Sequence, residues 1–420
     1  MSKRKLQSMN RRSFMQSVGA LSASLALGCN RSGRAGAAGA SRPIRIGILA
    51  TTDMAPIVMA EKLGYFKKNG LDEVILTKES SWSNIRDKLL IGELDLGQIL
   101  FGVPFLVYSG DDSAGKVIKI ALTLNVNNQT LTLAKDLAPK VGYGHTGGVK
   151  AAIEDIRKRN TSRPPTFGQS LNGSLPDMLL RSWLAASKVD PATVHIVTVP
   201  PPQAVAKMKV GELDGFYTAE PWHEVAVREG VGFTHYASQD MWQDAPDKCL
   251  AVNARFAAER RDEVKRVAKS VLEASRWLDV PSNRIEGAKA ISERAYVNLP
   301  VDLILPRFEV EARFNLGGGL GEKQFPPLGA LAFYKGGRAS FPHRSHGVWY
   351  MAQYVRFGLV RNPPDYNAAT DAILMQDLHR EVAGELGVPV PDDDMTPFVA
   401  QIDGVNFDPH DVGGSLRRYA

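Results

Sequence analysis

The chain has few cysteines and no strong excess of charge. Its 420 residues include two cysteines, Cys29 and Cys249, so at most one disulfide can form and a cysteine cage around a metal is excluded. The formal net charge is +6, and no run of lysine and arginine is interleaved with aromatic residues. This pattern argues against a nucleic-acid partner. We expect no cofactor and no metal.

Long hydrophobic runs are also missing. After the first thirty residues no stretch approaches eighteen uninterrupted apolar residues, so the mature chain should not cross a membrane. A hydrophobic content of 44% and a charged content of 23% are ordinary for a globular protein. The roughly 390 residues after Cys29 are too many for a single small hydrophobic core and are enough for two lobes.

The first thirty residues predict export. The paired arginines of Asn10–Met15 precede an apolar run over Val18–Leu27 and then Gly28-Cys29. A basic start followed by a short apolar run is typical of an export signal, and the arginine pair favours the twin-arginine route. We interpret residues 1–29 as this signal and Cys29 as a lipidation site. Residues 30–43, rich in glycine, alanine and serine, form a predicted flexible tether. The mature protein would then meet the membrane only through a lipid anchor.

Alternating strand and helix patterns predict an open α/β fold. Ile44–Ala50 is typical of a buried parallel strand, and Pro56 opens a helix to about Lys68. The first block continues with predicted strands at 74–77 and 95–99 around a helix at 84–91. A second block has predicted strands at 141–145, 195–199 and 215–217 and predicted helices at 149–159, 175–187 and 203–210. The chain then returns with a predicted strand at 250–253 and predicted helices at 261–278 and 285–295. We expect lobe 1 over 44–135 and 243–420, lobe 2 over 136–242, and a cleft between them.

Several motifs resemble one known family, the periplasmic solute-binding proteins of nitrate, bicarbonate and related ABC importers. Ser81–Leu89 and Leu124–Gln129 are similar to segments of the nitrate branch, as are Glu220-Pro221-Trp222 and the tail segment Phe341–Tyr350. The resemblance extends from about residue 43 to the end. It implies a two-lobed type II binding protein outside the cytoplasm, with a C-terminal extension packed on lobe 1. It also implies a non-enzymatic function and a permease and ATPase as partners.

The same resemblance implies a ligand site. The family's tryptophan, glutamine and lysine match Trp82, Gln129 and Lys248. A histidine that the nitrate and bicarbonate members place at the opening of a middle helix is missing, because the turn here is Gly173–Asp177. This departure leaves the ligand open. Lys248 argues against bicarbonate, whose branch resembles a site with an acid at that position and a calcium ion beside it.

These side chains suit a small anion, which loses hydration in a buried site and must regain charge and hydrogen bonds. Lys248 offers an ammonium group, Gln129 an amide and Trp82 an indole N–H. Thr51 and Thr52 follow the first strand, where open α/β sheets collect ligands. The helix openings after Asp53 and Ser174 would direct backbone N–H groups into the cleft.

Each residue also has a structural alternative. Lys248 closely follows Asp244 and Asp247 in the sequence and could form a surface ion pair. Trp82 could belong to the core, and Gln129 to a solvated turn. Ser174 is expected to cap a helix, and Glu220 to brace the crossing between the lobes by accepting backbone N–H bonds. The tail residues His343, His346 and Trp349 are expected to pack rather than to bind metal.

Two other functions remain open. One is an exported sensor or binding module for a sulfonate, cyanate or a pyrimidine-like molecule. The other is an enzyme on the same scaffold, similar to the pyrimidine synthases of thiamine biosynthesis. Those enzymes use a histidine and a cysteine-rich segment that this chain lacks, and no nucleophile–base pair is evident in the sequence. We therefore expect a small-solute receptor, with an anion such as nitrate as its ligand.

Overall fold

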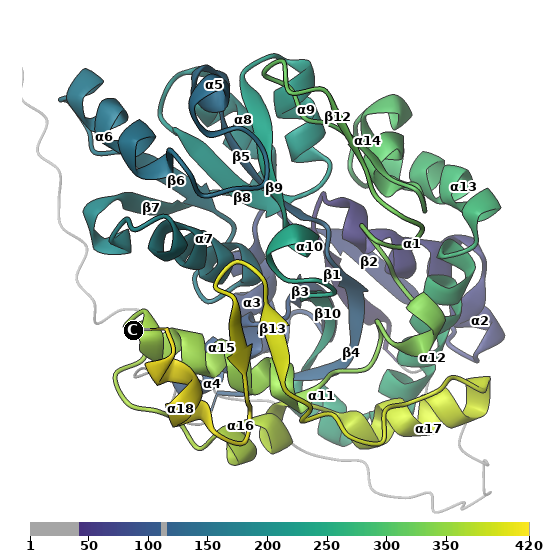
Figure 1. Cartoon of the computed structure of the whole chain (residues 1–420). Coiled ribbons are helices and arrows are strands. Elements are labelled where there is room, and N and C mark those ends of the chain that lie inside the picture. Colours follow the sequence, from purple (N-terminus) through teal and green to yellow (C-terminus); the bar gives the residue numbers. More distant parts are fainter. Residues whose placement is uncertain (1–41, 111–115, 420) are drawn as a thin grey trace, which may run out of the picture. The chain divides into compact units, whose positions relative to one another are not determined.

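The computed structural model describes residues 42–110 and 116–419. Residues Pro43–Ala420 form one compact unit, and within it the strands build two separate five-stranded sheets (Figure 1). We call the part around the first sheet lobe 1 and the part around the second sheet lobe 2. The prediction of an α/β fold with two lobes is confirmed.

The first sheet is mostly parallel on one side and antiparallel on the other. Its strands lie in the order β2 (Val74–Lys78), β1 (Ile44–Ile48), β3 (Leu96–Leu100), β10 (Pro246–Asn253) and β4 (Ile118–Val126). β1 runs parallel to β2 and β3, whereas β10 runs antiparallel to β3 and β4. The helices around it are α1 (Ala55–Lys62), α2 (Tyr65–Lys68), α3 (Trp82–Ile91), α4 (Val103–Ser109), α11 (Ala254–Glu259), α12 (Arg261–Leu278) and α13 (Pro281–Ser292). Buried valines at 264, 267 and 271 give α12 one apolar face, which packs against α1.

The second sheet repeats this arrangement. Its strands lie in the order β7 (His195–Thr198), β6 (Thr166–Gln169), β8 (Gly215–Ala219), β5 (Gln129–Ala134) and β9 (Gly232–Ala237). β5 is antiparallel to both of its neighbours. The helices of this lobe are α5 (Ala138–Val141), α6 (Val149–Arg159), α7 (Leu175–Ala186), α8 (Pro201–Lys209), α9 (Trp222–Arg228) and α10 (Ser238–Met241).

The chain first changes sheet at Asn127-Asn128, between β4 and β5. This differs from the predicted boundary at residue 135, because β5 pairs with strands of the second sheet. Both asparagines have positive φ, 64° and 78°, which asparagine tolerates better than most residues. The chain returns between β9 and β10, at 238–245.

A later segment also differs from the predicted lobe division. α14 (Val301–Phe308) and the hairpin of β11 (Arg313–Asn315) and β12 (Glu322–Gln324) follow lobe 1 in the sequence, yet α14 and β11 contact α9 of lobe 2. The N–H of Thr234 in β9 donates to the carbonyl of Leu316 at 2.7 Å. Residues 301–325 therefore belong partly to the surface of lobe 2.

Two predicted elements are wrong in detail. The expected helix over 56–68 is divided into α1 and α2 at Gly64, whose φ of 71° interrupts the helix. The expected strand at 141–145 is not formed. Val141 is the last residue of α5. Gly142 and Gly144, with φ of 58° and 78°, turn the chain at this place.

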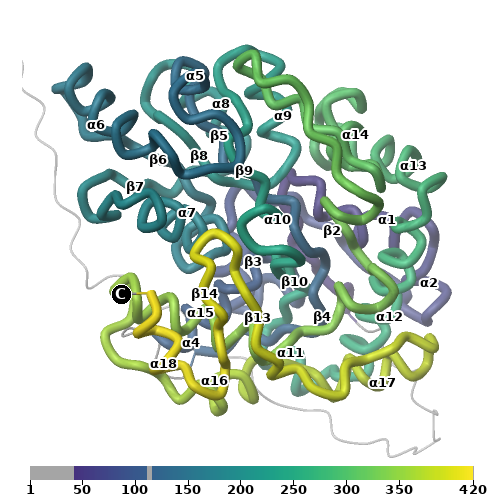
Figure 2. The backbone as a smooth tube through the Cα atoms, in the orientation of Figure 1, coloured from purple at the N-terminus to yellow at the C-terminus, as the bar shows by residue number. Residues whose placement is uncertain are grey.

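The C-terminal extension packs on lobe 1, as expected from the resemblance (Figure 2). It consists of α15 (Arg344–Arg356), α16 (Tyr366–Ile373), α17 (Gln376–Leu386), β13 (Phe398–Ala400), β14 (Val405–Phe407) and α18 (Val412–Arg417). α15 and α16 contact α4, while α17 contacts β4 and α12. Trp349 is fully buried, in line with a packing role.

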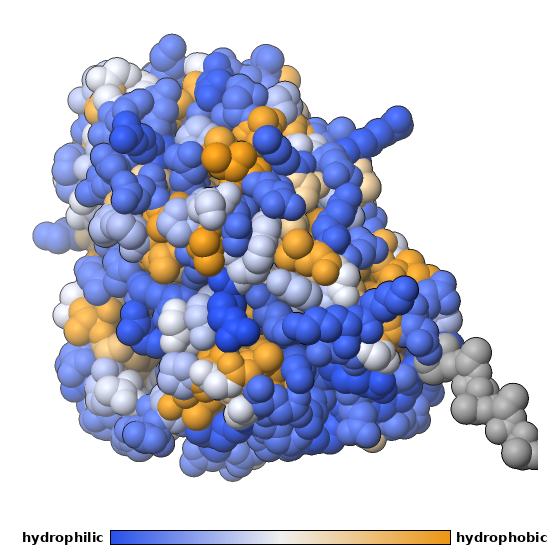
Figure 3. Space-filling view, turned by 90° about the vertical axis from the view of Figure 1, so that its right-hand side faces the viewer, coloured by the Kyte–Doolittle hydropathy of each residue, from blue (hydrophilic) through white to orange (hydrophobic). Residues whose placement is uncertain are grey.

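None of the helices in the described residues is long and apolar enough to cross a membrane. The face in Figure 3 is largely hydrophilic, and its hydrophobic residues lie in small separate groups. Cys249 is buried and free, and burial raises the pKa of its thiol well above the ordinary value. The predicted export signal and Cys29 lie outside the described residues.

Candidate functional site

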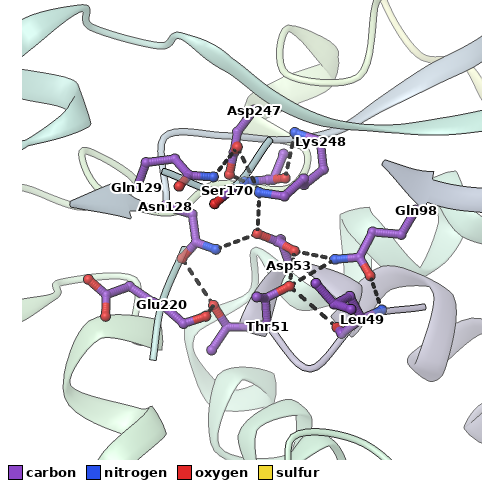
Figure 4. A network of polar contacts seen from close by, with 12 residues as sticks. Leu49, Thr51, Asp53, Gln98, Asn128, Gln129, Ser170, Glu220, Asp247 and Lys248 are labelled. Atoms are coloured by element: carbon purple, nitrogen blue, oxygen red, sulfur yellow. Dashed lines mark hydrogen bonds and ion pairs between the residues drawn. The ribbon is translucent and has the colours of Figure 1, made fainter. Parts of the chain in front are cut away.

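A buried polar cluster lies where β1, β3 and β10 of lobe 1 approach β5 of lobe 2 (Figure 4). All seven predicted ligand residues have at most 1% of their surface exposed: Thr51, Thr52, Trp82, Gln129, Ser174, Glu220 and Lys248. Thr51 and Thr52 directly follow β1, and Gln129 is the first residue of β5. The fold thus brings residues from distant parts of the sequence to one junction between the lobes.

Lys248 is the centre of this cluster. Its Nζ lies 2.9 Å from Oδ2 of Asp53 and 2.8 Å from Oδ1 of Asp247, and all three side chains are fully buried. The alternative of a surface ion pair is therefore wrong. Asp244, the other acidic neighbour in the sequence, pairs with Lys335 instead. One ammonium faces two carboxylates, so the cluster is not the net cationic crevice that the sequence suggested.

The charges of this ion triad depend on each other. Burial raises the pKa of Asp247 to about 6; Lys248 opposes that rise and Asp53 adds to it. Burial lowers the pKa of Lys248, but the two carboxylates outweigh this effect and raise it above its ordinary value. Near neutral pH the ammonium therefore keeps its proton, while Asp247 takes up a proton more readily on acidification than an ordinary aspartate does.

Amide side chains hold both carboxylates in place. Oδ1 of Asp53 accepts hydrogen bonds from Gln98 and Thr51, and its Oδ2 accepts one from Asn128. Asp247 accepts hydrogen bonds from Nε2 of Gln129 at 2.5 Å and from Nδ2 of Asn125 at 3.1 Å. Such a network fixes the geometry of the triad before any solute arrives.

Five of these residues were not predicted as ligand residues: Asp53, Gln98, Asn125, Asn128 and Asp247. Gln98 had a usable signal, since it is a polar residue inside an otherwise apolar strand. Asp53 follows the first strand beside the two predicted threonines.

Three polar atoms of the cluster lack a hydrogen-bond partner within the described ranges. They are Nε1 of Trp82, Oε1 of Gln129 and Oε2 of Glu220, and all are buried. The ring of Trp82, at the start of α3, lies 5.2 Å from Nζ of Lys248. Buried polar atoms are normally paired, so an unpaired indole N–H beside an ammonium is a natural place for a ligand acceptor.

Ser174 and Glu220 make hydrogen bonds that stabilise the surrounding protein structure. The Oγ of Ser174 accepts the N–H of Asp177 at 3.4 Å and so caps α7. Glu220 was expected to accept backbone N–H bonds, but its Oε1 accepts from Arg307 and from Thr130, both at 2.8 Å. Its backbone carbonyl, rather than its carboxylate, accepts the N–H of Thr52. None of these bonds reaches the triad.

The cluster offers hydrogen-bonding groups but little for bond chemistry. Its acidic and basic groups are bound to one another, and the hydroxyl of Thr51 donates to Asp53, whose carboxylate is already paired with Lys248. Among the residues that the structure describes, no three histidine, cysteine or acidic side chains are grouped to hold a metal.

Comparisons with known proteins show which family the chain belongs to. Residues 37–292 match the NMT1-like family. The chain is 30% identical over 378 residues to the nitrate/nitrite binding protein NrtA of Synechocystis sp., which covers 87% of this chain and 82% of NrtA. It is 28% identical over 441 residues to the bicarbonate-binding protein CmpA of Synechococcus elongatus, which covers 96% of each.

Solved structures of solute-binding proteins are also similar to this chain. The crystal structure of the periplasmic nitrate-binding protein NrtA from Synechocystis PCC 6803 superimposes with a TM-score of 0.84 at 28% identity, covering 90% of this chain and 98% of that one. The alkanesulfonate-binding protein SsuA from Xanthomonas axonopodis, with a TM-score of 0.57 at 13% identity over 78% of this chain and 97% of that one, shares the fold. The chain therefore belongs to the NMT1-like family, within the group of two-lobed solute-binding proteins that includes NrtA.

Proposed function

We propose that the chain is the solute-binding component of an ABC importer and captures a small planar oxyanion, such as nitrate or nitrite, by closure of its lobes. The observation that carries this proposal is the buried ammonium of Lys248 beside the unpaired indole N–H of Trp82 at the lobe junction. The relatives supply the context. They are named as nitrate/nitrite and bicarbonate binding proteins, and a nitrate import ATP-binding protein, NrtC, is similar over 89% of the chain. The partners would then be a permease and an ATPase.

The ion triad sets a condition for anion binding. With both carboxylates ionised, the triad carries a net charge of −1, which repels an anion. Protonation of Asp247 brings the triad to zero and leaves an ammonium and an indole N–H facing the solute. Since the pKa of Asp247 is raised to about 6, the affinity for an anion should rise as the pH falls through this value.

Calorimetry with the full chain tests the proposal. Nitrate, nitrite, bicarbonate, cyanate, alkanesulfonates and pyrimidines are titrated at about pH 5 and about pH 8, on either side of the Asp247 titration. We expect nitrate or nitrite to bind more tightly at the lower pH, and Lys248→Met to abolish that binding. Absence of heat with every anion at both values would contradict an anion receptor, and heat with pyrimidines alone would favour the sensor or pyrimidine-like alternative.

We also propose that the protein works outside the cytoplasm, exported by the twin-arginine route and anchored through a lipid on Cys29. The supporting observations are the sequence of residues 10–29 and the similarity to a protein whose crystal structure is described as that of a periplasmic protein.

Replacing Arg11 and Arg12 by lysine should block export. Cys29→Ser should release the mature protein from the membrane fraction, and a variant that stays membrane-bound would disprove the lipid anchor.

A further inference from the structure

A second cavity lies apart from the ion triad, at the joint between the lobes and the C-terminal extension. It has a volume of about 210 Å³. Its walls come from four parts of the chain: the end of β4, the return crossing between α10 and β10, the segment around Lys335–Ala339, and the tail from Phe341 to β13. In Figure 1 these elements meet near α10, β13 and α15. Neither the motifs nor the proposed transport function assigns it a role.

Aromatic rings form one wall of this cavity. Trp242 and Phe398 stack with an interplanar angle of 2° and a centroid distance of 4.9 Å. His346 stands edge-on to both rings, at 5.5 Å from Trp242 and 5.7 Å from Phe398. A flat apolar wall of this kind suits a planar or cyclic molecule. A cavity of about 150 Å³ is enough for benzene, so this one accommodates a single ring with one small substituent.

Charged side chains also line the cavity. Lys335 and Arg338 line the cavity together with Asp244. Lys335 donates to both carboxylate oxygens of Asp244, at 2.5 and 2.7 Å, so these two charges compensate each other. The exposed guanidinium of Arg338 has no hydrogen-bond or ion-pair partner in the part of the chain that the structure describes. One positive charge with a planar fork of donors thus remains available, and such a fork matches a carboxylate.

A third feature is an unpaired polar atom. Nδ1 of His346 is buried and has no partner among the described residues. The neighbouring His343 also lines the cavity. Burial lowers the pKa of both rings, so the imidazoles are neutral near pH 7 and each offers one N–H and one acceptor. They supply hydrogen bonds without adding charge.

We propose that this cavity is a second ligand site for a small monocyclic carboxylate, whose ring lies against Trp242 and Phe398 and whose carboxylate pairs with Arg338. The site adjoins both crossings between the lobes, since Val126 precedes the first crossing and Trp242 to Asp244 lie in the second. Pro246, which also lines it, directly precedes Asp247 of the ion triad. An occupant therefore contacts the joint on which lobe movement depends.

The test uses the full chain with sodium benzoate, followed by tryptophan fluorescence and by calorimetry, and benzamide as a neutral ligand of the same shape. Benzoate should bind saturably, and benzamide about tenfold more weakly, because it lacks the charge that pairs with Arg338. Arg338→Gln should reduce benzoate affinity about tenfold and leave benzamide unchanged. Arg255→Gln, a similarly exposed arginine on α11, is the matched control and should change neither.

Two further variants locate the site. Ala339→Leu, which fills the cavity beside Phe341, should abolish binding of both molecules while the melting temperature shows that the chain still folds. Trp82→Phe, at the ion triad, should leave benzoate affinity intact. The proposal is overturned if benzoate fails to saturate, if Arg338→Gln binds it normally, or if Trp82→Phe abolishes its binding.

Discussion

At the scale of single residues, Asp247 is the side chain whose protonation has the widest consequences. Burial raises its pKa to about 6, above the ordinary value of about 4. Between about pH 4 and about pH 6, Asp247 therefore holds a proton in the folded state that it has lost in the unfolded chain. This contribution to stability is fully present below about pH 4 and is lost as the pH rises through about 6.

Asp247→Asn should remove this dependence. The asparagine keeps an acceptor for Lys248 and for Gln129 but cannot titrate. Urea unfolding measured between about pH 4 and about pH 7 should show a smaller decline of stability with rising pH in the variant than in the native chain. Parallel pH profiles would mean that Asp247 titrates normally. Asp136→Asn, an exposed acid of lobe 2, serves as the control.

Replacing Lys248 tests the ion triad by removing its cation. Lys248→Met keeps most of the volume but leaves Asp53 and Asp247 buried without a counter-charge, which should cost about 3–5 kcal/mol at neutral pH. The triple variant with Asp53→Asn and Asp247→Asn should recover much of this loss, since no buried charge then remains. Equal stabilities of the single and triple variants, from chemical unfolding, would contradict a buried ion triad.

At the scale of elements, the side chain of Arg307 attaches α14 to three parts of lobe 2. Arg307 is fully buried and donates to Glu220 at 2.8 Å, to Glu224 at 3.1 Å and to Thr234 at 2.8 Å. These partners belong to the segment after β8, to α9 and to β9. A guanidinium with five fixed donors joins three elements in a way that lysine cannot.

Arg307→Met should therefore destabilise the chain by about 3–5 kcal/mol, because it leaves Glu220 buried without a cation and Glu224 with Arg228 as its remaining partner. Arg313→Met, an exposed arginine on the adjacent β11, should change stability by less than about 0.5 kcal/mol. Thermal and urea unfolding of both variants provide the measurement. A small loss for Arg307→Met would mean that Glu220 finds another partner.

The elements also show what the sequence can and cannot predict. Helices α6 and α12 were placed correctly because each has apolar residues on one face and charged residues on the other. β4 and β5 were not predicted, although they carry the first crossing between the lobes. Their residues are buried almost throughout, so no alternation marks them as strands.

The candidate site also has features that the sequence predicts and features that it does not. Trp82, Gln129 and Lys248 could be selected from motifs, but their charge environment could not. Asp53 and Lys248 are 195 residues apart, and only the fold brings them to 2.9 Å. A cationic site was predicted because Lys248 was considered without Asp53. Long-range pairing of charges is the part of a site that local patterns do not contain.

At the scale of the whole molecule, the C-terminal extension joins the lobes. The hydroxyl of Tyr354 in α15 lies 2.6 Å from the carbonyl of Gly102 in lobe 1 and 2.8 Å from that of Gly173 in lobe 2. Gly173 has a φ of 74° and rests against α4: a Cβ there would lie 2.6 Å from Cδ2 of Leu106. The lobes are therefore in direct contact at this point, and the absence of a side chain at Gly173 permits it.

Tyr354→Phe should weaken this contact by about 1 kcal/mol, the usual worth of one hydrogen bond, without altering either sheet. Tyr350→Phe is the matched control, because its hydroxyl donates at 3.1 Å to Pro246 within lobe 1 alone. Small-angle X-ray scattering should show a larger radius of gyration for Tyr354→Phe than for Tyr350→Phe. Gly173→Ala should open the lobes further, and adding Leu106→Ala should partly close them again, because it removes the atoms that the new methyl group meets. If all four variants scatter alike, then the contact at Gly173 does not control closure, and lobe movement must be restrained elsewhere, with the joint around Arg307 as the next place to examine.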